Sequence, residues 1–136
     1  MDARAIFENF PVPPASALLG WCFQAYDPEQ RRIEISFDGK PAFCNQAGVI
    51  QGGLLSAMLD DTMGPAVLVA SGGSKLCKTV DLHCHFLRPV PVGPIRCTAR
   101  VLQLGRSIAF IEGELFDQEG RLCLRGQSSA QLADLG

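Results

Sequence analysis

The sequence predicts an α+β domain in which an antiparallel β-sheet wraps around one central helix. The first observation is the stretch after Gly53, whose apolar residues leave no wide polar stripe, as is typical of a helix buried in a core. The second is the series of strand-like segments after Lys75, which are separated by turn residues. One apolar helix followed by an antiparallel meander is an α+β pattern, and a sheet that curls round the helix would bury it well.

The chain before this helix is expected to contain a short helix, two strands and a loop. Pro11-Val-Pro-Pro14 would end the first helix, because proline has no N–H to donate. The second strand alternates clearly, with Ile33, Ile35 and Phe37 on one face. In order, the expected elements are a helix over residues 3–10, strands over 18–26 and 32–37, and a loop over 41–50.

The chain after the central helix is expected to form four strands. Alternation places Ile95, Cys97, Ala99 and Val101 on one face, and the following strand repeats the pattern. The expected strands cover residues 75–88, 95–104, 107–116 and 122–132. Inside the helix, Pro65 cannot donate the hydrogen bond back to residue 61, so we expect a kink or a break near Gly64.

Composition bounds the class of protein. The 136 residues are expected to form a single domain, with residues 1–16 as a lead-in helix and proline-rich turn. A formal net charge of −2 and the absence of a Lys/Arg run argue against nucleic acid or an anionic membrane as the main partner. No membrane span or secretory signal is expected. Six scattered cysteines without C-x-x-C spacing favour reduced thiols in the cytoplasm.

The start of the central helix and the carboxylates within it suggest a site. Gly52 and Gly53 stand where a capping side chain is usual, so a ligand oxygen could approach the first N–H groups and the positive end of the helix dipole. Asp60 lies in an apolar helix, where a carboxylate needs a partner, a raised pKa or a chemical role. Together they suggest acyl chemistry; the alternative is a turn and a core helix with a hydrogen-bonded Asp. The neighbouring Asp61 is expected to pair with a basic residue.

A second cluster of polar residues is a candidate metal site. Asp81, His83 and His85 lie on one face of the expected strand, and two His at i and i+2 can chelate zinc. The outer two residues would be about 13 Å apart along an extended strand, so all three are hard to gather on one ion. We therefore expect no metal, and expect the His pair to lie near a subunit contact.

Several motifs taken together resemble a known family. They are Asn45, Gln51-Gly52-Gly53, Asp60, Thr79-Val80-Asp81-Leu82, Phe86-Leu87-Arg88-Pro89 and Gly105-Arg106. In order and spacing, this set resembles the hotdog-fold acyl-CoA thioesterases, most closely the phenylacetate-degradation (PaaI-like) branch, over residues 18–132. Those enzymes usually carry His where this chain has Gln51, and Gln cannot titrate near neutrality.

The resemblance implies a role for each matched residue. The Gly52 N–H would polarise the thioester carbonyl, and Asp60 would act as nucleophile or general base. Asn45 and Gln51 would line the site, while Thr79 would position the water or the carboxylate. Coenzyme A would be bound by the residues Gly53, Arg88 and Arg106, although an Arg after a strand is also common on ordinary surfaces.

The expected function is hydrolysis of an acyl-CoA thioester, with no cofactor beyond the coenzyme A of the substrate. Gly52 and Asp60 are eight residues apart, about 12 Å along a regular helix, so one helix cannot bring both to one carbonyl. Two antiparallel copies can, which predicts a homodimer, expected to assemble further as a dimer of dimers. The acyl group, aromatic or aliphatic, stays open. The alternatives are a hotdog hydratase, disfavoured without the His, and a non-catalytic binder of acyl-CoA or another small ligand.

Overall fold

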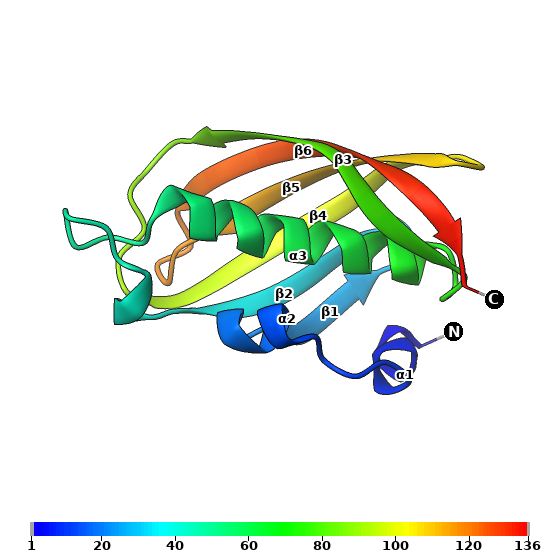
Figure 1. Ribbon diagram of the computed structural model, residues 1–136, viewed down its shortest axis with the longest axis horizontal. Coiled ribbons are helices and arrows are strands. Elements are labelled where there is room, and N and C mark those ends of the chain that lie inside the picture. Colours follow the sequence, from blue (N-terminus) through cyan, green and yellow to red (C-terminus); the bar gives the residue numbers. More distant parts are fainter. Residues whose placement is uncertain (1, 136) are drawn as a thin grey trace.

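A six-stranded antiparallel sheet curls around one long helix, α3 (Figure 1). The computed structural model describes residues 2–135, so both ends of the expected domain, residues 1 and 136, lie outside the described part. The sheet order is β1-β2-β4-β5-β6-β3. The elements are α1 (Ala3–Glu8), α2 (Pro14–Leu19), β1 (Cys22–Asp27), β2 (Arg32–Gly39), η1 (Pro41–Phe43), α3 (Gly52–Ala70), β3 (Lys75–Phe86), β4 (Gly93–Leu104), β5 (Ile108–Phe116) and β6 (Leu122–Asp134). This arrangement confirms the predicted fold class.

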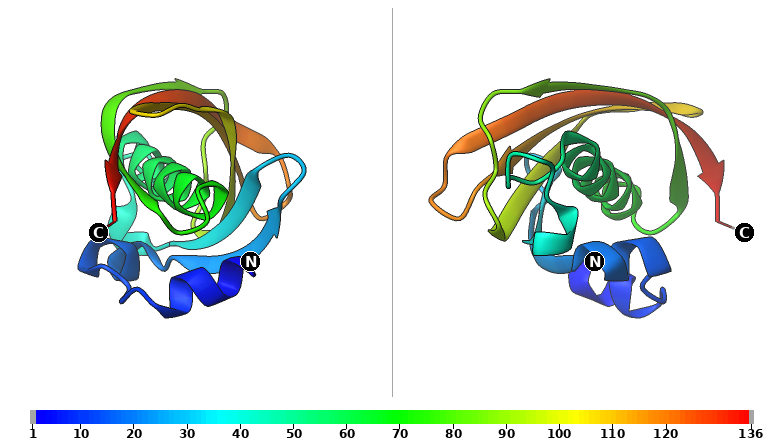
Figure 2. Two further views of the ribbon diagram at one scale, coloured as in Figure 1. Left: turned by 90° about the vertical axis from the view of Figure 1, so that its right-hand side faces the viewer. Right: turned by 60° about the vertical axis from the view of Figure 1, so that its left-hand side comes forward.

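The helix α3 fills the concave face of the sheet, as the end-on view shows (Figure 2). Its buried side chains are Leu55, Met58, Leu59, Thr62, Met63, Ala66, Val67, Leu68 and Val69. They meet the predicted inward faces of β2, β4 and β5, which are likewise buried. By length and composition alone α3 could cross a membrane, but half of this stretch is buried inside the domain, as in the core helix of a folded protein.

The predicted break at Gly64 is wrong, because α3 continues without interruption through Pro65. Proline leaves the carbonyl of Asp61 without its usual helical donor. The indole N–H of Trp21 donates to this carbonyl at 3.0 Å and thereby replaces the missing hydrogen bond. Trp21 lies directly before β1 and is 40 residues away from Asp61 in sequence.

The first predicted strand also needs correction at its start. Leu18 and Leu19 belong to α2, which begins with Pro14 in its first turn and ends at Gly20 with φ of 77°. Proline is suited to a first helical turn and glycine to the left-handed residue that follows a helix. The strand β1 therefore begins only at Cys22.

A bulge in β3 changes which side chains face the helix. The pairing of β3 with β6 shifts between Thr79 and Asp81, and the side chain of Val80 is left 66% exposed. Before the bulge, Cys77 and Thr79 face α3; after it, Leu82, Cys84 and Phe86 do so. The bulge thus lets both halves of a long edge strand contact the same helix.

Candidate active site

The first turn of α3 presents backbone donors that have no acceptor within residues 2–135. Gln51 is the N-cap residue, and its side chain makes no capping hydrogen bond. Its backbone N–H donates to the carbonyl of Phe43 at 2.9 Å, which fixes the entry into the helix. The Gly52 and Gly53 N–H groups therefore remain available to a ligand oxygen, at the positive end of the helix.

Glycine at position 52 suits the close approach of β3. A Cβ on Gly52 would lie 3.2 Å from Cε1 of Phe86, which is tighter than an ordinary van der Waals contact. At Gly53 a Cβ would meet nothing within 4 Å. The two glycines thus differ: Gly52 lies beneath the Phe86 ring, while Gly53 opens to solvent.

Asn45 shapes the loop in front of the helix. Its Oδ1 accepts the N–H of Ala47 at 2.9 Å and the N–H of Val49 at 3.4 Å, so the side chain closes the loop as an Asx turn. Asn45 lines a shallow cavity with Gln51. It also lines a cleft of about 300 Å³ with Gly52 and Arg88.

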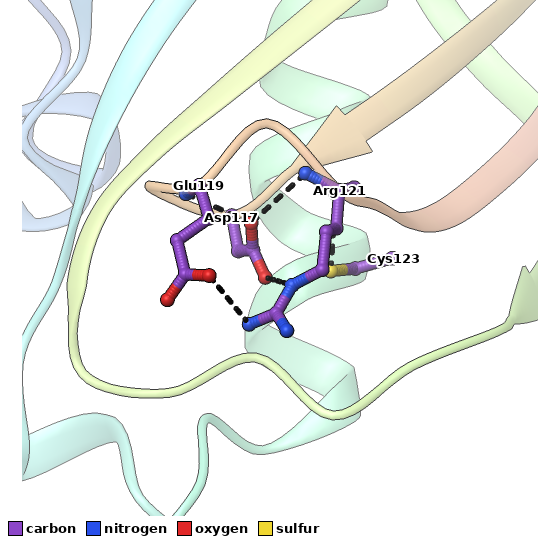
Figure 3. Close-up of polar contacts among 4 residues, drawn as sticks. All are labelled: Asp117, Glu119, Arg121 and Cys123. Atoms are coloured by element: carbon purple, nitrogen blue, oxygen red, sulfur yellow. Dashed lines mark hydrogen bonds and ion pairs between the residues drawn. The ribbon is translucent and has the colours of Figure 1, made fainter.

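The backbone of Arg88 is held by the start of β6. The N–H groups of Leu87 and Arg88 both donate to the carbonyl of Cys123, at 2.8 and 3.2 Å. The turn before Cys123 is itself fixed by Asp117, whose carboxylate accepts the Arg121 backbone N–H at 3.0 Å and the Arg121 Nε–H at 2.9 Å (Figure 3). The exposed guanidinium of Arg88 is thereby carried by a well-anchored segment at the mouth of the cleft.

Asp60 and Thr79 form the second part of the site. The Thr79 hydroxyl lies 2.7 Å from Asp60 Oδ1 and donates to it, joining the middle of α3 to β3. Thr79 is exposed and Asp60 is half-buried, so the pair is open to a ligand. Within residues 2–135 no hydrogen bond holds the other carboxylate oxygen, so it is placed to take a proton or attack a carbon.

The predicted residues form two groups and one outlier. Asn45, Gln51, Gly52 and Arg88 gather at the start of α3, while Asp60 and Thr79 lie about 12 Å further along the uninterrupted helix. The β4–β5 turn, which carries Arg106, lies at the opposite end of the sheet from the start of α3 (Figure 1). A single chain therefore does not bring all of them to one point.

Asp61 behaves differently from its sequence-based expectation. No ion pair among the described residues involves it, so the expected basic partner is wrong. Burial raises the pKa of the Asp61 carboxyl, the Ser16 hydroxyl acts in the opposite direction, and the Asp60 charge raises it further. Its Oδ2 is buried and finds no hydrogen-bond partner within residues 2–135. Asp61 faces the N-terminal segment, whose helix α2 the sequence analysis did not predict.

The His pair lies on the opposite face of β3 from Thr79. His83 Nε2 and His85 Nε2 are 3.2 Å apart, and Asp81 Oδ1 accepts the N–H of Ser129 at 2.8 Å. Among the described residues, no three His, Cys, Asp or Glu side chains are placed to hold one metal ion. The expectation that the protein binds no metal stays a prediction.

Comparison with known proteins identifies the family. The family model described as the thioesterase superfamily matches residues 47–124. A Saccharolobus solfataricus protein provisionally named an esterase is 30% identical over 94 residues, which are 69% of this chain and 66% of that relative, just under two thirds of its length.

Solved structures support the same family. A provisionally assigned thioesterase from Ralstonia eutropha JMP134, related to phenylacetic acid degradation, has 34% identity and a TM-score of 0.85, covering 95% of this chain and 97% of that one. The Escherichia coli PaaI protein of the phenylacetic acid degradation operon shares the fold, with a TM-score of 0.80 at 18% identity, over 98% and 91% of the two chains. The chain therefore belongs to the hotdog-fold thioesterase superfamily, with phenylacetic acid degradation-related thioesterases among its structural neighbours.

Proposed function

We propose that this protein hydrolyses acyl-CoA thioesters, with Asp60 of one subunit and the Gly52 N–H of a second subunit acting on the same carbonyl. The observation that carries the proposal is the Asp60–Thr79 pair on a helix whose first N–H groups have no acceptor among the described residues. A carboxylate and an oxyanion-binding donor are the two parts that thioester hydrolysis needs.

In the reaction, the thioester carbonyl oxygen accepts the Gly52 N–H, and the carbonyl carbon is attacked. Asp60 either removes a proton from the attacking water or attacks first to form an anhydride that water then hydrolyses. In both routes the C–S bond breaks, and the sulfur of coenzyme A leaves as a thiolate and takes up a proton. Thr79 holds one Asp60 oxygen and so directs the other toward the carbon.

The two-subunit site is supported by the edge position of β3. This strand has 12 residues and ends the sheet, so one side of its backbone has no strand partner within the described chain. An exposed edge of this length favours pairing with a second chain. Antiparallel pairing of two β3 strands would set the two α3 helices antiparallel, and each Gly52 would then approach the partner's Asp60. Further assembly into a dimer of dimers is proposed through the outer face, where Leu102, Ile108 and Phe110 are exposed.

Coenzyme A would enter past the start of α3. Arg88 stands exposed beside Gly52 and offers a guanidinium to a phosphate group. Arg106 belongs to the β4–β5 turn, at the opposite end of the sheet from the start of α3, and could contribute only in an assembly that brings this turn to a neighbouring site.

The test is a panel of aliphatic and aromatic acyl-CoA substrates, with release of free thiol as the readout. Asp60→Asn should lower kcat by about 100-fold or more with KM near the wild-type value, because the lost group acts mainly in the transition state. Glu29→Gln, an exposed carboxylate in the β1–β2 turn, is the matched control and should retain activity. Binding without turnover across the panel would favour the non-catalytic alternative, and equal activity of wild type and Asp60→Asn would remove Asp60 from the mechanism.

A further inference from the structure

The outer face of the sheet carries a hollow beside the two His residues of β3. This hollow has a volume of about 800 Å³ and is lined by residues of β3, β4, β5 and β6, among them His83 and His85. Both His side chains are exposed. The Asp60–Thr79 pair lies on the other face of β3, so the proposed hydrolysis makes no use of the His pair.

The two imidazoles are arranged as a metal chelate requires. His83 Nε2 and His85 Nε2 are 3.2 Å apart, and the two ring planes are inclined by 77°. In a tetrahedral zinc site with Zn–N bonds of about 2.0–2.1 Å, two coordinating nitrogens lie about 3.3 Å from each other. One ion can therefore bind both Nε2 atoms with almost no rearrangement of the pair. The alternative is an N–H···N hydrogen bond between the two rings.

One chain supplies only part of a zinc site. The carboxylate of Asp81 accepts the Ser129 N–H at 2.8 Å, so it is turned toward β6. Among residues 2–135, no third His, Cys, Asp or Glu side chain is placed to join the pair on one ion. A structural zinc ion takes four protein ligands. The other two must therefore come from a second chain.

We propose that the His83–His85 pairs of two copies of this chain bind one zinc ion and join the outer faces of their sheets. A twofold axis through the ion brings the same two side chains from each copy, which gives four imidazole ligands. Stacked sheets lie about 10 Å apart, so an ion midway is about 5 Å from each sheet, within reach of a His side chain. The contact would also cover Leu102 and Phe110, which are exposed and line the same hollow.

The charges around the hollow are compatible with a cation. Arg125 pairs with His85 across β3 and β6, and its charge opposes a metal ion. Glu112 and Glu114 line the same hollow and contribute two negative charges. The sequence-based expectation of no metal rests on gathering Asp81, His83 and His85 on one ion. A site shared between two copies does not need Asp81.

The experiment adds Zn²⁺ to the metal-free protein and measures both binding and mass. Calorimetry should give one tightly bound zinc ion per two chains, because each ion takes one His pair from each of two copies. Size exclusion with light scattering should show that the mass in solution doubles when zinc is added, since each contact joins two of the units that are present without it.

Three variants separate metal binding from hydrogen bonding and folding. His85→Gln can still hydrogen-bond to His83 but is a poor zinc ligand; it should weaken zinc binding by about 100-fold or more, since loss of a residue that merely orients a ligand already costs about 10–100-fold. His85→Cys supplies a thiolate and should restore zinc binding at the same stoichiometry. Gln127→Ala removes the exposed residue opposite His83 and should leave binding and assembly unchanged. Thermal melts without zinc check that all three variants fold.

Two kinds of result would overturn the proposal. Absence of zinc binding by the wild type, or equal zinc affinity of the wild type and His85→Gln, would show that the two rings are only hydrogen-bonded to each other. One ion per chain, or zinc binding without a change in mass, would show that the ion does not join two copies. No acyl-CoA enters this experiment, so failure of the zinc site leaves the proposed hydrolysis untouched.

Discussion

Gln51 stands beside the first glycine of α3, where the resemblance implies a His, and its side chain is exposed without a capping hydrogen bond. If Gln51 positions groups through its amide, Gln51→Ala should lower kcat/KM. Gln51→His should keep or raise kcat/KM and should make kcat/KM depend on pH near neutrality, because imidazole titrates there. The measurement is a pH profile of kcat/KM on the best substrate. Unchanged kcat/KM in Gln51→Ala would show that this position is only structural.

Thr79 is the clearest test of how Asp60 is held. Thr79→Val keeps the shape but removes the hydroxyl that donates to Asp60 Oδ1, so kcat should fall by about tenfold while folding is retained. Thr79→Ser restores the donor and should recover most of the activity. Unchanged kcat in Thr79→Val would mean that this hydrogen bond does not position the carboxylate.

The sequence predicts the contact of one site residue correctly and that of another wrongly. Thr79 was assigned a positioning role from the resemblance, and the structure places its hydroxyl on Asp60. Asp61 was expected to meet a base, but its neighbours are Ser16 and the residues around Trp21. These come from a segment some 40 residues away in sequence, and no local pattern predicts such a contact. The Pro13-Pro14 and Gly20 signals could have indicated α2 and hence this neighbourhood.

At the scale of elements, the β5–β6 turn gives a prediction about stability. The Arg121 backbone N–H, above all, lowers the pKa of Asp117, and the Arg121 side chain and Glu119 N–H act in the same direction. A carboxyl whose folded-state pKa is lowered stabilises the fold above its unfolded pKa, and this contribution is lost as pH falls through the folded value. Asp117→Asn should therefore lower the melting temperature at neutral pH by about 4 °C or more.

The pH dependence separates this effect from simple loss of packing. The difference between wild type and Asp117→Asn should shrink as pH falls below about 4, where the unfolded Asp takes up its proton. Thermal melts at a series of pH values provide the measurement, with the exposed Glu29→Gln as control. A difference that stays constant down to low pH would contradict the ionic origin of the stabilisation.

The strands were predicted well where one face is buried. Period-two alternation placed Ile33, Ile35 and Phe37 inside, and all three are buried in the structure. The β3 bulge at Val80 was not predictable, because both registers leave this edge strand with polar and apolar residues on each face. The continuous α3 was missed for a related reason: the Trp21 indole that replaces the hydrogen bond lost at Pro65 comes from outside the helix.

At the scale of the whole molecule, the uninterrupted α3 determines whether one chain or two chains are needed to form the site. Gly52 and Asp60 lie on the same uninterrupted stretch of α3, about 12 Å apart along the helix axis, and helical geometry keeps them apart. If both act on one thioester, the second component must come from another chain. The unpaired edge of β3 offers the surface for it.

Mixed dimers test this shared site most directly. Gly52→Pro removes the N–H, and proline is tolerated at the first position of a helix, although the Phe86 ring must shift. Gly52→Ala is its control, because it adds a Cβ at the same place but keeps the N–H. Circular dichroism and size exclusion should show that Gly52→Pro and Asp60→Asn both fold as dimers, each nearly inactive alone.

The decisive measurement is the activity of these two chains after they are unfolded and refolded as an equal mixture. Random pairing gives about half heterodimers, each with one intact site made of the unaltered Gly52 and the unaltered Asp60, so about a quarter of wild-type activity should return. Folded, inactive homodimers and a verified heterodimer that is also inactive would contradict a site shared between two subunits.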